Sequence, residues 1–293
     1  MKEKFKSWKP SAESSEIIIH ITTILEEYRN QGYNLTLRQL YYQLVSRDII
    51  PNTVGDYNRI GNIVSNGRMA GMIDWDMIED RVRIPEIRTH WDSPREILEV
   101  AKNTYYKSRW ETQQFYIEVW CEKDAISNII IPVCREYDVP FMANRGYSSQ
   151  SAMYEAAQRI NTHLDQGKSI RIIYLGDHDP SGIDMTRDID DRLGLFTRCG
   201  SPLGDVQRIA LNRDQIDEFN PPKNPAKITD SRYEKYVEVY GESSWELDAL
   251  NPRTLDSLVR EAITAYIDEE EWEKIEQEEA EQQEMIQDLI DKF

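Results

Sequence analysis

Hydrophobic residues recur at helical spacing near the start of the chain. The stretch 17–31 carries an apolar stripe made by Ile17, Ile18, Ile21, Ile24 and Leu25. Residues with this spacing share one face of a helix, which packs against a core. We therefore expect a first helix that is capped by Ser14 or Ser15 and ends at Gly32.

Two more helices are expected before residue 71. The sequence LRQLYYQLVSR follows the candidate caps Asn34 and Thr36, and Asp48 and Pro51 stop it. A third helix is expected from about Tyr57 to Ala70. Three helices with a turn between the last two suggest a helix-turn-helix. The third helix has no acidic residue, so its candidate DNA-binding residues are Arg59, Asn62 and Arg68.

Beyond residue 114, short apolar runs alternate with helical segments. The expected strands are 115–121, 139–143, 169–176 and 206–211, and the expected helices lie near 125–137, 149–164 and 182–193. Such alternation predicts an α/β fold whose parallel sheet has helices on both faces. In these sheets, ligands bind at the carboxyl ends of the strands.

Charge is distributed unevenly along the 293 residues, whose formal net charge is −18. The segment 268–293 carries twelve acids and two lysines, hence −10, whereas residues 1–71 carry nine bases and seven acids. This distribution excludes indiscriminate electrostatic binding to nucleic acid and leaves room for local contact with DNA.

The expected location is the cytoplasm, with no contact with a membrane. No apolar run reaches the roughly 20 residues that cross a bilayer, and the polar start lacks a signal-peptide core. The three cysteines, Cys121, Cys134 and Cys199, lack a CxxC pair, so we expect reduced thiols, with no disulfide framework or zinc site.

Three carboxylates follow two of the expected strands. Glu122 comes directly after the first strand, and Asp177 and Asp179 come after the third. Side chains alternate in an extended chain, so the two aspartates point to one side and His178 points away. If the two strands are neighbours, Glu122 joins them, and the usual partner of such a trio is Mg²⁺ or Mn²⁺. An acid-rich turn without a metal is the alternative.

A second acidic pair follows in WELDAL, residues 245–250. Glu246 and Asp248 alternate there and are candidates for extra carboxylates at the same site. The alternative is a solvated end of a strand or helix.

The sequences CEKDA and GDHDPSG, with the spacing between them, resemble the Toprim domain of topoisomerases, primases and certain nucleases. The DxDPxG element is most similar to the topoisomerase VI A subunit and the related meiotic protein that cuts both DNA strands. The resemblance implies that Glu122, Asp177 and Asp179 bind the metal, with Glu122 also catalytic.

The sequence TLRQLYY resembles the element of that family in which a winged helix carries the nucleophilic tyrosine. Matched residue by residue, Tyr42 is the nucleophile and Arg38 its catalytic neighbour. Residues four apart share a helix face, so the guanidinium can approach the phenol, whereas Tyr41 points elsewhere and belongs to the core. The alternative for Tyr42 is an ordinary aromatic of an amphipathic helix.

Four segments follow from the resemblance. They are a winged-helix DNA-binding domain at 1–90, a linker at 91–114, a Toprim domain with an extension at 115–250 and a helical, acidic tail at 251–293. The implied activity is metal-dependent cleavage of double-stranded DNA by tyrosine transesterification, as in type IIB topoisomerases.

In that family a homodimer makes the double-strand break, with the tyrosine of one protomer meeting the metal of the other. A separate GHKL-type ATPase subunit is a further expected partner, since the chain contains no such module. Two alternatives stay open: a Toprim nuclease that hydrolyses DNA with metal-activated water, and a non-catalytic winged-helix DNA-binding protein.

Overall fold

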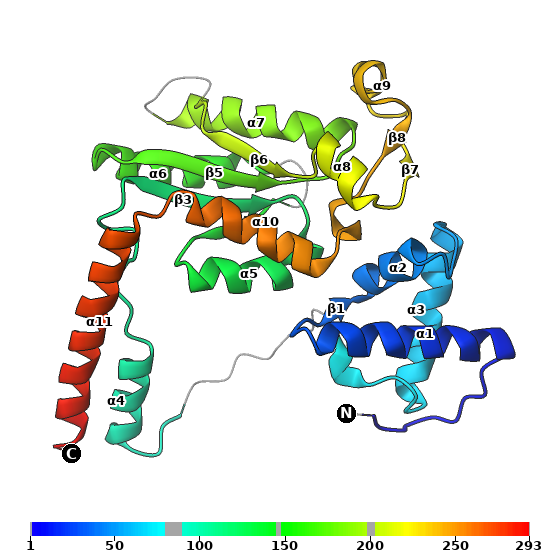
Figure 1. The fold of residues 1–293 in the computed structure, drawn as a ribbon, viewed down its shortest axis with the longest axis horizontal. Coiled ribbons are helices and arrows are strands. Elements are labelled where there is room, and N and C mark those ends of the chain that lie inside the picture. The colour runs from blue at the N-terminus through cyan, green and yellow to red at the C-terminus, as the bar shows by residue number, and fades with distance from the viewer. Residues whose placement is uncertain (1, 80–89, 145–147, 198–202, 293) are drawn as a thin grey trace.

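The amino-terminal part of the chain is a helical unit around one apolar core (Figure 1). The computed structural model describes residues 2–79, 90–144, 148–197 and 203–292. The three expected helices are present, but Ser11 caps the first one in place of Ser14 or Ser15, and Thr36 and Thr53 cap the other two. They are α1 (Ala12–Arg29), α2 (Leu37–Ser46) and α3 (Val54–Met69).

Two very short strands close the helical unit. β1 (Leu35–Thr36) pairs in parallel with β2 (Ile78–Glu79), which follows the 3-10 turn η1 (Trp75–Met77). Within residues 2–79 this parallel pair stands where a winged helix would have an antiparallel hairpin. The described helical unit is therefore a three-helix structure without a visible wing.

A four-stranded parallel sheet forms the second unit, as the alternating pattern predicted. Its strand order is β4-β3-β5-β6, and every neighbouring pair runs parallel. The strands are β3 (Phe115–Cys121), β4 (Phe141–Ala143), β5 (Ser169–Leu175) and β6 (Val206–Ala210). All four lie within the predicted ranges.

Helices cover both faces of this sheet because its strands are apolar on both sides (Figure 1). One core joins Ile117, Val119 and Cys121 to α5 (Ser127–Glu136) and α10 (Pro252–Thr264). The other core joins Tyr116 and Trp120 to α6 (Gln150–Asp165) and α7 (Pro180–Phe196). Cys121 and Cys134 are free and buried, as expected, whereas Cys199 lies outside the described residues.

Short elements connect β6 to α10 at the edge of the sheet that faces the helical unit. The chain passes through α8 (Arg213–Phe219), β7 (Asn224–Pro225), α9 (Tyr233–Tyr240), β8 (Ser243–Ser244) and the 3-10 turn η3 (Leu247–Ala249). β7 and β8 pair antiparallel. η3 packs on α2, and Ala249 belongs to the core of the helical unit. The two units therefore share a packed interface.

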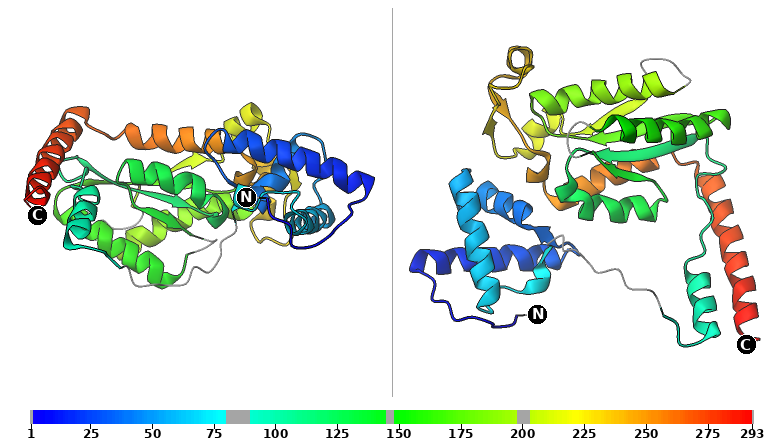
Figure 2. Two further views of the ribbon diagram at one scale, coloured as in Figure 1. Left: turned by 90° about the horizontal axis from the view of Figure 1, so that it is seen from below. Right: turned by 180° about the vertical axis from the view of Figure 1, so that it is seen from behind.

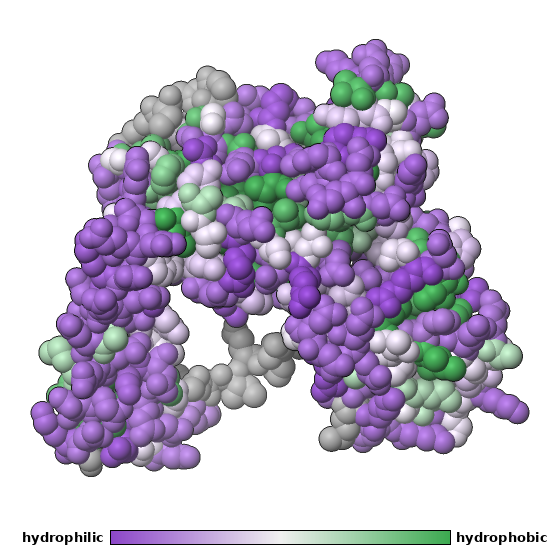
Figure 3. Space-filling view, viewed as in Figure 1, coloured by the Kyte–Doolittle hydropathy of each residue, from purple (hydrophilic) through white to green (hydrophobic). Residues whose placement is uncertain are grey.

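Two helices form an arm that projects from the sheet (Figures 1 and 2). α4 (Pro94–Asn103) lies in the segment expected as a linker, and it begins there because Ser93 caps it. It runs antiparallel to the acidic α11 (Glu269–Ile290), where Lys102 Nζ donates to Gln287 Oε1 at 2.7 Å. The visible face of the arm is mostly hydrophilic, and it lies apart from the helical unit (Figure 3).

The turn between β5 and α7 depends on a glycine. A Cβ on Gly182 would lie 2.2 Å from the carbonyl oxygen of Asp177. We expect Gly182→Ala to lower the free energy of unfolding by about 2 kcal/mol, because the backbone must move to admit a methyl group. Urea unfolding measures this change.

Gly55→Ala is the matched control. Its Cβ would meet only Thr53 Oγ1, at 3.6 Å, in the first turn of α3. It should be neutral or slightly stabilising, since alanine favours a helix. Equal losses in the two variants would contradict the steric argument.

Candidate functional site

The carboxyl ends of β3 and β5 bring Glu122 and Asp177 together. The two strands are neighbours, as their role in the predicted site requires, with Cys121 opposite Leu175. The amide of Glu122 donates to the carbonyl of Leu175 at 2.9 Å. In turn, the Glu122 carboxylate accepts a hydrogen bond from the amide of Asp177 at 3.0 Å.

Asp179 serves as the cap of α7. Its Oδ1 accepts hydrogen bonds from the amide of Gly182 at 2.6 Å and from Ser181 Oγ at 3.0 Å. Its Oδ2 lies 3.8 Å from the ammonium of Lys227, a residue that the sequence did not single out. Burial and then the charge of Asp179 raise the pKa of Glu122, so these two carboxylates repel each other electrostatically.

Asp177 is turned toward other partners. Its Oδ1 accepts from the amide of Leu247 at 2.8 Å, and its Oδ2 lies 2.7 Å from Lys123 Nζ. Burial raises the pKa of Asp177 well above its usual value, although the charge of Lys123 opposes the rise. In the part of the chain that the structure describes, no three carboxylate, histidine or cysteine side chains form a metal-holding group.

Glu246 and Asp248 reach this cluster, as the WELDAL pattern suggested. Lys123 Nζ pairs with Glu246 Oε2, and Arg38 Nη2 donates to the same oxygen at 2.9 Å. Arg38 Nε lies against Asp248 Oδ2, whose side chain is fully buried. Burial disfavours the charge of Glu246, but Lys123 and Arg38 together lower its pKa, so it is ionised.

The result is a chain of alternating charges, which we call the ion-pair chain. It runs from the sheet to the helical unit through Asp177, Lys123, Glu246, Arg38 and Asp248. The sequence pointed to every member except Lys123, whose only signal was its place directly after Glu122.

Tyr42 lies beside Arg38 of the ion-pair chain. The guanidinium of Arg38 lies 5.6 Å from the centre of the Tyr42 ring, as expected for residues on one helix face. Burial and then the charges of Glu246 and Asp248 raise the pKa of Tyr42 to about 12, although Arg38 opposes this rise. Tyr41 is in the core, as expected, and its hydroxyl donates to the carbonyl of Thr53 at 3.0 Å.

A cavity of about 440 Å³ lies between the two units. Both units line it, with Tyr42 and Arg38 on one side and Asp179, Glu246 and Lys227 on the other. The amino-terminal turn of α3 borders the same cavity through Thr53 and Val54. The cavity thus brings the predicted tyrosine and one predicted metal ligand to the same space.

Two neighbours fix the backbone around the carboxylates. The buried guanidinium of Arg208 donates to the carbonyls of Gly176 and Gly182, both at 2.8 Å, and to that of Asp177 at 2.6 Å. His178 points away from the aspartates, as predicted, and its Nδ1 lies 2.8 Å from the hydroxyl of Tyr236. Burial lowers the pKa of His178 to about 4, so the imidazole is neutral.

The three candidate DNA-binding residues differ in how exposed their side chains are. Asn62 is exposed on α3, and Arg59 is partly exposed but pairs with Glu13 at 2.8 Å. Arg68 corrects the expectation, because it is buried and donates to the carbonyls of Trp75, at 2.9 Å, and Ile78. It closes the turn after α3, so it is not available to contact DNA.

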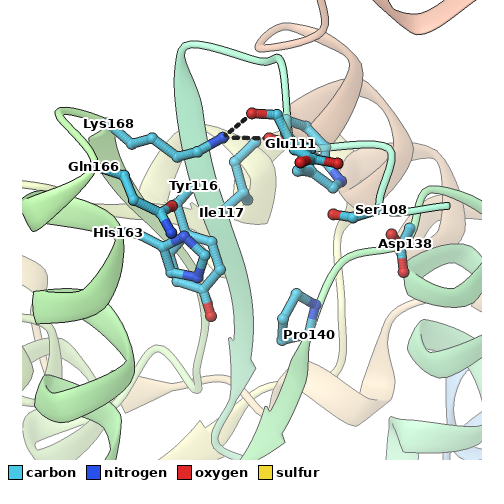
Figure 4. Close-up of a pocket in the computed structure, with 10 residues that line it drawn as sticks. Ser108, Glu111, Tyr116, Ile117, Asp138, Pro140, His163, Gln166 and Lys168 are labelled. Atoms are coloured by element: carbon cyan, nitrogen blue, oxygen red, sulfur yellow. Dashed lines mark hydrogen bonds between the residues drawn. The ribbon is translucent and has the colours of Figure 1, made fainter. Parts of the chain in front are cut away.

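Another cavity, of about 590 Å³, lies near the amino end of β3 (Figure 4). Lys168 borders it, and its ammonium donates to the carbonyls of Glu111 at 2.9 Å and Gln113 at 3.0 Å. None of the predicted site residues lines this cavity. The predicted site residues Glu122 and Asp177 lie at the other end of the strands, where β3 and β5 end.

Comparisons with known proteins add no family to this picture. The sequence matches no protein-family model, and a search of curated proteins finds no similar sequence. Across the described residues, no helix is both long and apolar enough to cross a membrane.

Lys123 should be essential to the stability of the cluster. Lys123→Met leaves Asp177 and Glu246 without their shared cation, so the free energy of unfolding should fall by about 3 kcal/mol at pH 7. Without the lysine, the folded-state pKa of Asp177 rises further above its unfolded value. The loss should therefore shrink as pH falls, because protonation of Asp177 removes the charge that the lysine stabilised.

Urea unfolding of wild type and variant between pH 5 and 8 measures this difference. Lys274→Met removes two surface ion pairs of α11 and should leave stability unchanged at every pH. A Lys123→Met deficit that does not depend on pH would contradict the assigned pairing.

Proposed function

We propose that this protein is a metal-dependent DNA-cleaving transesterase, similar to the A subunit of type IIB topoisomerases. The helical unit, which has no wing within residues 2–79, would take the place of the winged-helix domain, and the sheet unit would be the Toprim domain. The observation that carries the proposal is the shared cavity, in which Tyr42 and Arg38 of the helical unit face Asp179 and Glu246. The resemblance of TLRQLYY and GDHDPSG to that family adds independent support.

The reaction needs a nucleophile, a positioned phosphate and a leaving group. The Oη of Tyr42 forms a bond to phosphorus, and the bond from phosphorus to one deoxyribose oxygen breaks. The phenolic proton passes to water, and the released oxygen leaves as a hydroxyl after it takes up a proton. The new phosphotyrosine ester preserves the energy of the broken phosphodiester bond, so the strand can be resealed.

The cations around the cavity suit a DNA phosphate. Arg38 has a planar fork that fits two phosphate oxygens, and Lys227 reaches the same cavity from the loop before α9. The amino-terminal turn of α3 adds the positive end of a helix dipole. These groups would hold the phosphate against Tyr42 and stabilise the negative charge that develops on it.

Mg²⁺ or Mn²⁺ is the proposed cofactor. Glu122 and Asp179 fit this role, because both are oxygen donors and the charge of Asp179 raises the pKa of Glu122. Asp177 would join them only by exchanging Lys123 for the metal. When bound, the ion would neutralise charge on the phosphate oxygens and orient the leaving oxygen.

The proposed partners are double-stranded DNA, a second copy of the chain for cutting the other strand, and a separate GHKL-type ATPase. The proposed location is the cytoplasm. The segment that would lie on DNA is the exposed side of α3, around Asn62.

A second candidate function is a nuclease that hydrolyses DNA. It is favoured by the environment of Tyr42, which is 6 % exposed and has a pKa raised to about 12. Such a phenol is almost entirely protonated at neutral pH and attacks poorly. In this case, water replaces the phenol as the nucleophile and the DNA ends are free.

The test is cleavage of supercoiled plasmid with Mg²⁺ or Mn²⁺, stopped with detergent and analysed with and without protease. Wild type should give linear DNA that enters the gel only after protease, and chelation by EDTA should abolish it. Tyr42→Phe should lose this product by about a thousandfold or more, because the nucleophile is gone.

Tyr41→Phe is the matched control. It removes a buried hydroxyl next in sequence but no reacting atom, so the protein-linked product should remain. Free DNA ends that persist in Tyr42→Phe would assign the hydrolytic reaction. No cleavage by wild type, with or without a GHKL-type ATPase, would contradict both.

A further inference from the structure

A buried amide without a partner lies beside the proposed metal ligand Glu122. Asn144 directly follows β4, and its side chain is only 8 % exposed. Its Oδ1 and Nδ2 are both buried, and neither forms a hydrogen bond with any residue that the structure describes. Buried polar groups are nearly always hydrogen-bonded, because an unpartnered one has lost its contacts with water and gained nothing in return. The Asn144 amide therefore points to a ligand.

The register of the sheet places Asn144 next to Glu122. Cys121 lies opposite Ala143 where β3 and β4 end. The next residue of each strand is Glu122 on one side and Asn144 on the other. The amide of Asn144 still donates to the carbonyl of Cys121 at 2.7 Å, so the pairing continues to this point. Neighbouring residues of paired strands are about 5 Å apart, within reach of one shared ligand.

The two side chains also belong to the same face of the sheet. Trp120 and Met142 lie two residues before Glu122 and Asn144, and both pack in the core beneath α6 and α7. Because side chains alternate along a strand, residues two apart share a face. Glu122 and Asn144 are therefore directed to the α6 and α7 side of the sheet edge.

Glu122 has an oxygen that can accept a ligand. Its Oε2 accepts the hydrogen bond from the amide of Asp177, whereas Oε1 accepts none from the described part of the chain, Asn144 included. Asp177 itself is paired with Lys123 at 2.7 Å. A divalent ion at this edge therefore needs an oxygen from another residue unless it displaces the lysine.

We infer that Asn144 is a further metal ligand, whose Oδ1 binds the divalent ion together with Glu122 and Asp179. This inference rests on the proposed function, and it goes beyond the family resemblance, which implies carboxylate ligands alone. An amide oxygen is a hard donor that suits Mg²⁺ or Mn²⁺. It is also neutral, so it adds no negative charge beside two carboxylates that already repel each other.

Binding of Mn²⁺ to the full chain without DNA tests this ligand. Asn144→Leu keeps the branched shape of the side chain but removes its oxygen. Its affinity for Mn²⁺, measured from the electron paramagnetic resonance signal of the free ion, should be about tenfold or more below that of wild type. The Tm of the metal-free chain should not fall, because the substitution removes a buried polar group that has no partner.

Asn161→Leu is the matched control. Asn161 is a buried asparagine of α6 whose Nδ2 donates to the carbonyl of Phe196 at 3.5 Å. The same substitution there should leave the affinity for Mn²⁺ unchanged, because Asn161 lies outside the proposed site.

Asn144→Asp is the conservative variant. It keeps an oxygen and adds a charge, so it should bind Mn²⁺ at least as tightly as wild type. Without metal it should have a lower Tm than wild type, because the new carboxylate lies beside Glu122. This opposite response separates a metal ligand from an amide that only supports the fold.

Wild-type affinity for Mn²⁺ in Asn144→Leu would overturn the inference, and so would the absence of Mn²⁺ binding by wild type. If Asn144→Leu also lowers the Tm of the metal-free chain, Asn144→Asp decides: tight binding supports the ligand, and weak binding by both variants overturns it.

The inference and the proposed function fail separately. If Asn144→Leu binds Mn²⁺ weakly but wild type forms no protein-linked DNA, Asn144 remains a ligand and the proposed transesterase is wrong. If wild type forms protein-linked DNA but Asn144→Leu binds Mn²⁺ normally, the transesterase stands and the role of Asn144 is wrong.

Discussion

The interface between the two units depends on one carboxylate that two cations share. The same oxygen of Glu246, Oε2, contacts Lys123 of the sheet unit and Arg38 of the helical unit. Each of these charges is costly to bury alone, and each is stabilised by its neighbour. Because Arg38 and Tyr42 lie on one face of α2, the same ion pairs that join the units also set where the phenol lies.

The parallel sheet explains why the acidic residues gather at all. Glu122 and Asp177 follow β3 and β5, which are neighbours in register, so both leave the sheet at one edge. The backbone there is held by Arg208, and the α7 cap fixes Asp179. The cluster is pre-organised, and protein cations pair with Asp177, Glu246 and Asp248. A DNA phosphate or a divalent ion would have to compete with those pairs.

The periodic patterns predicted the helices α1 to α3 and the four strands of the parallel sheet, because burial on one or both faces repeats along the sequence. The helices α4 and α8 were not predicted, since α4 buries no residue within the monomer and α8 has only seven residues. At the site, the pattern could not show that Asp177 turns to Lys123 or that Arg68 is buried, because tertiary partners decide both. The role of Tyr42 as the nucleophile remains a prediction that rests on the family resemblance.

The most direct test of the account is to identify the atom to which DNA becomes linked. After cleavage with Mg²⁺, the complex is digested with nuclease and trypsin, and the peptides are sequenced by mass spectrometry. If Tyr42 is the nucleophile, a nucleotide should be found on the peptide Gln39–Arg47, attached to Tyr42 rather than Tyr41. An unmodified peptide in a reaction that has cut the DNA, or an adduct on any other residue, would contradict it.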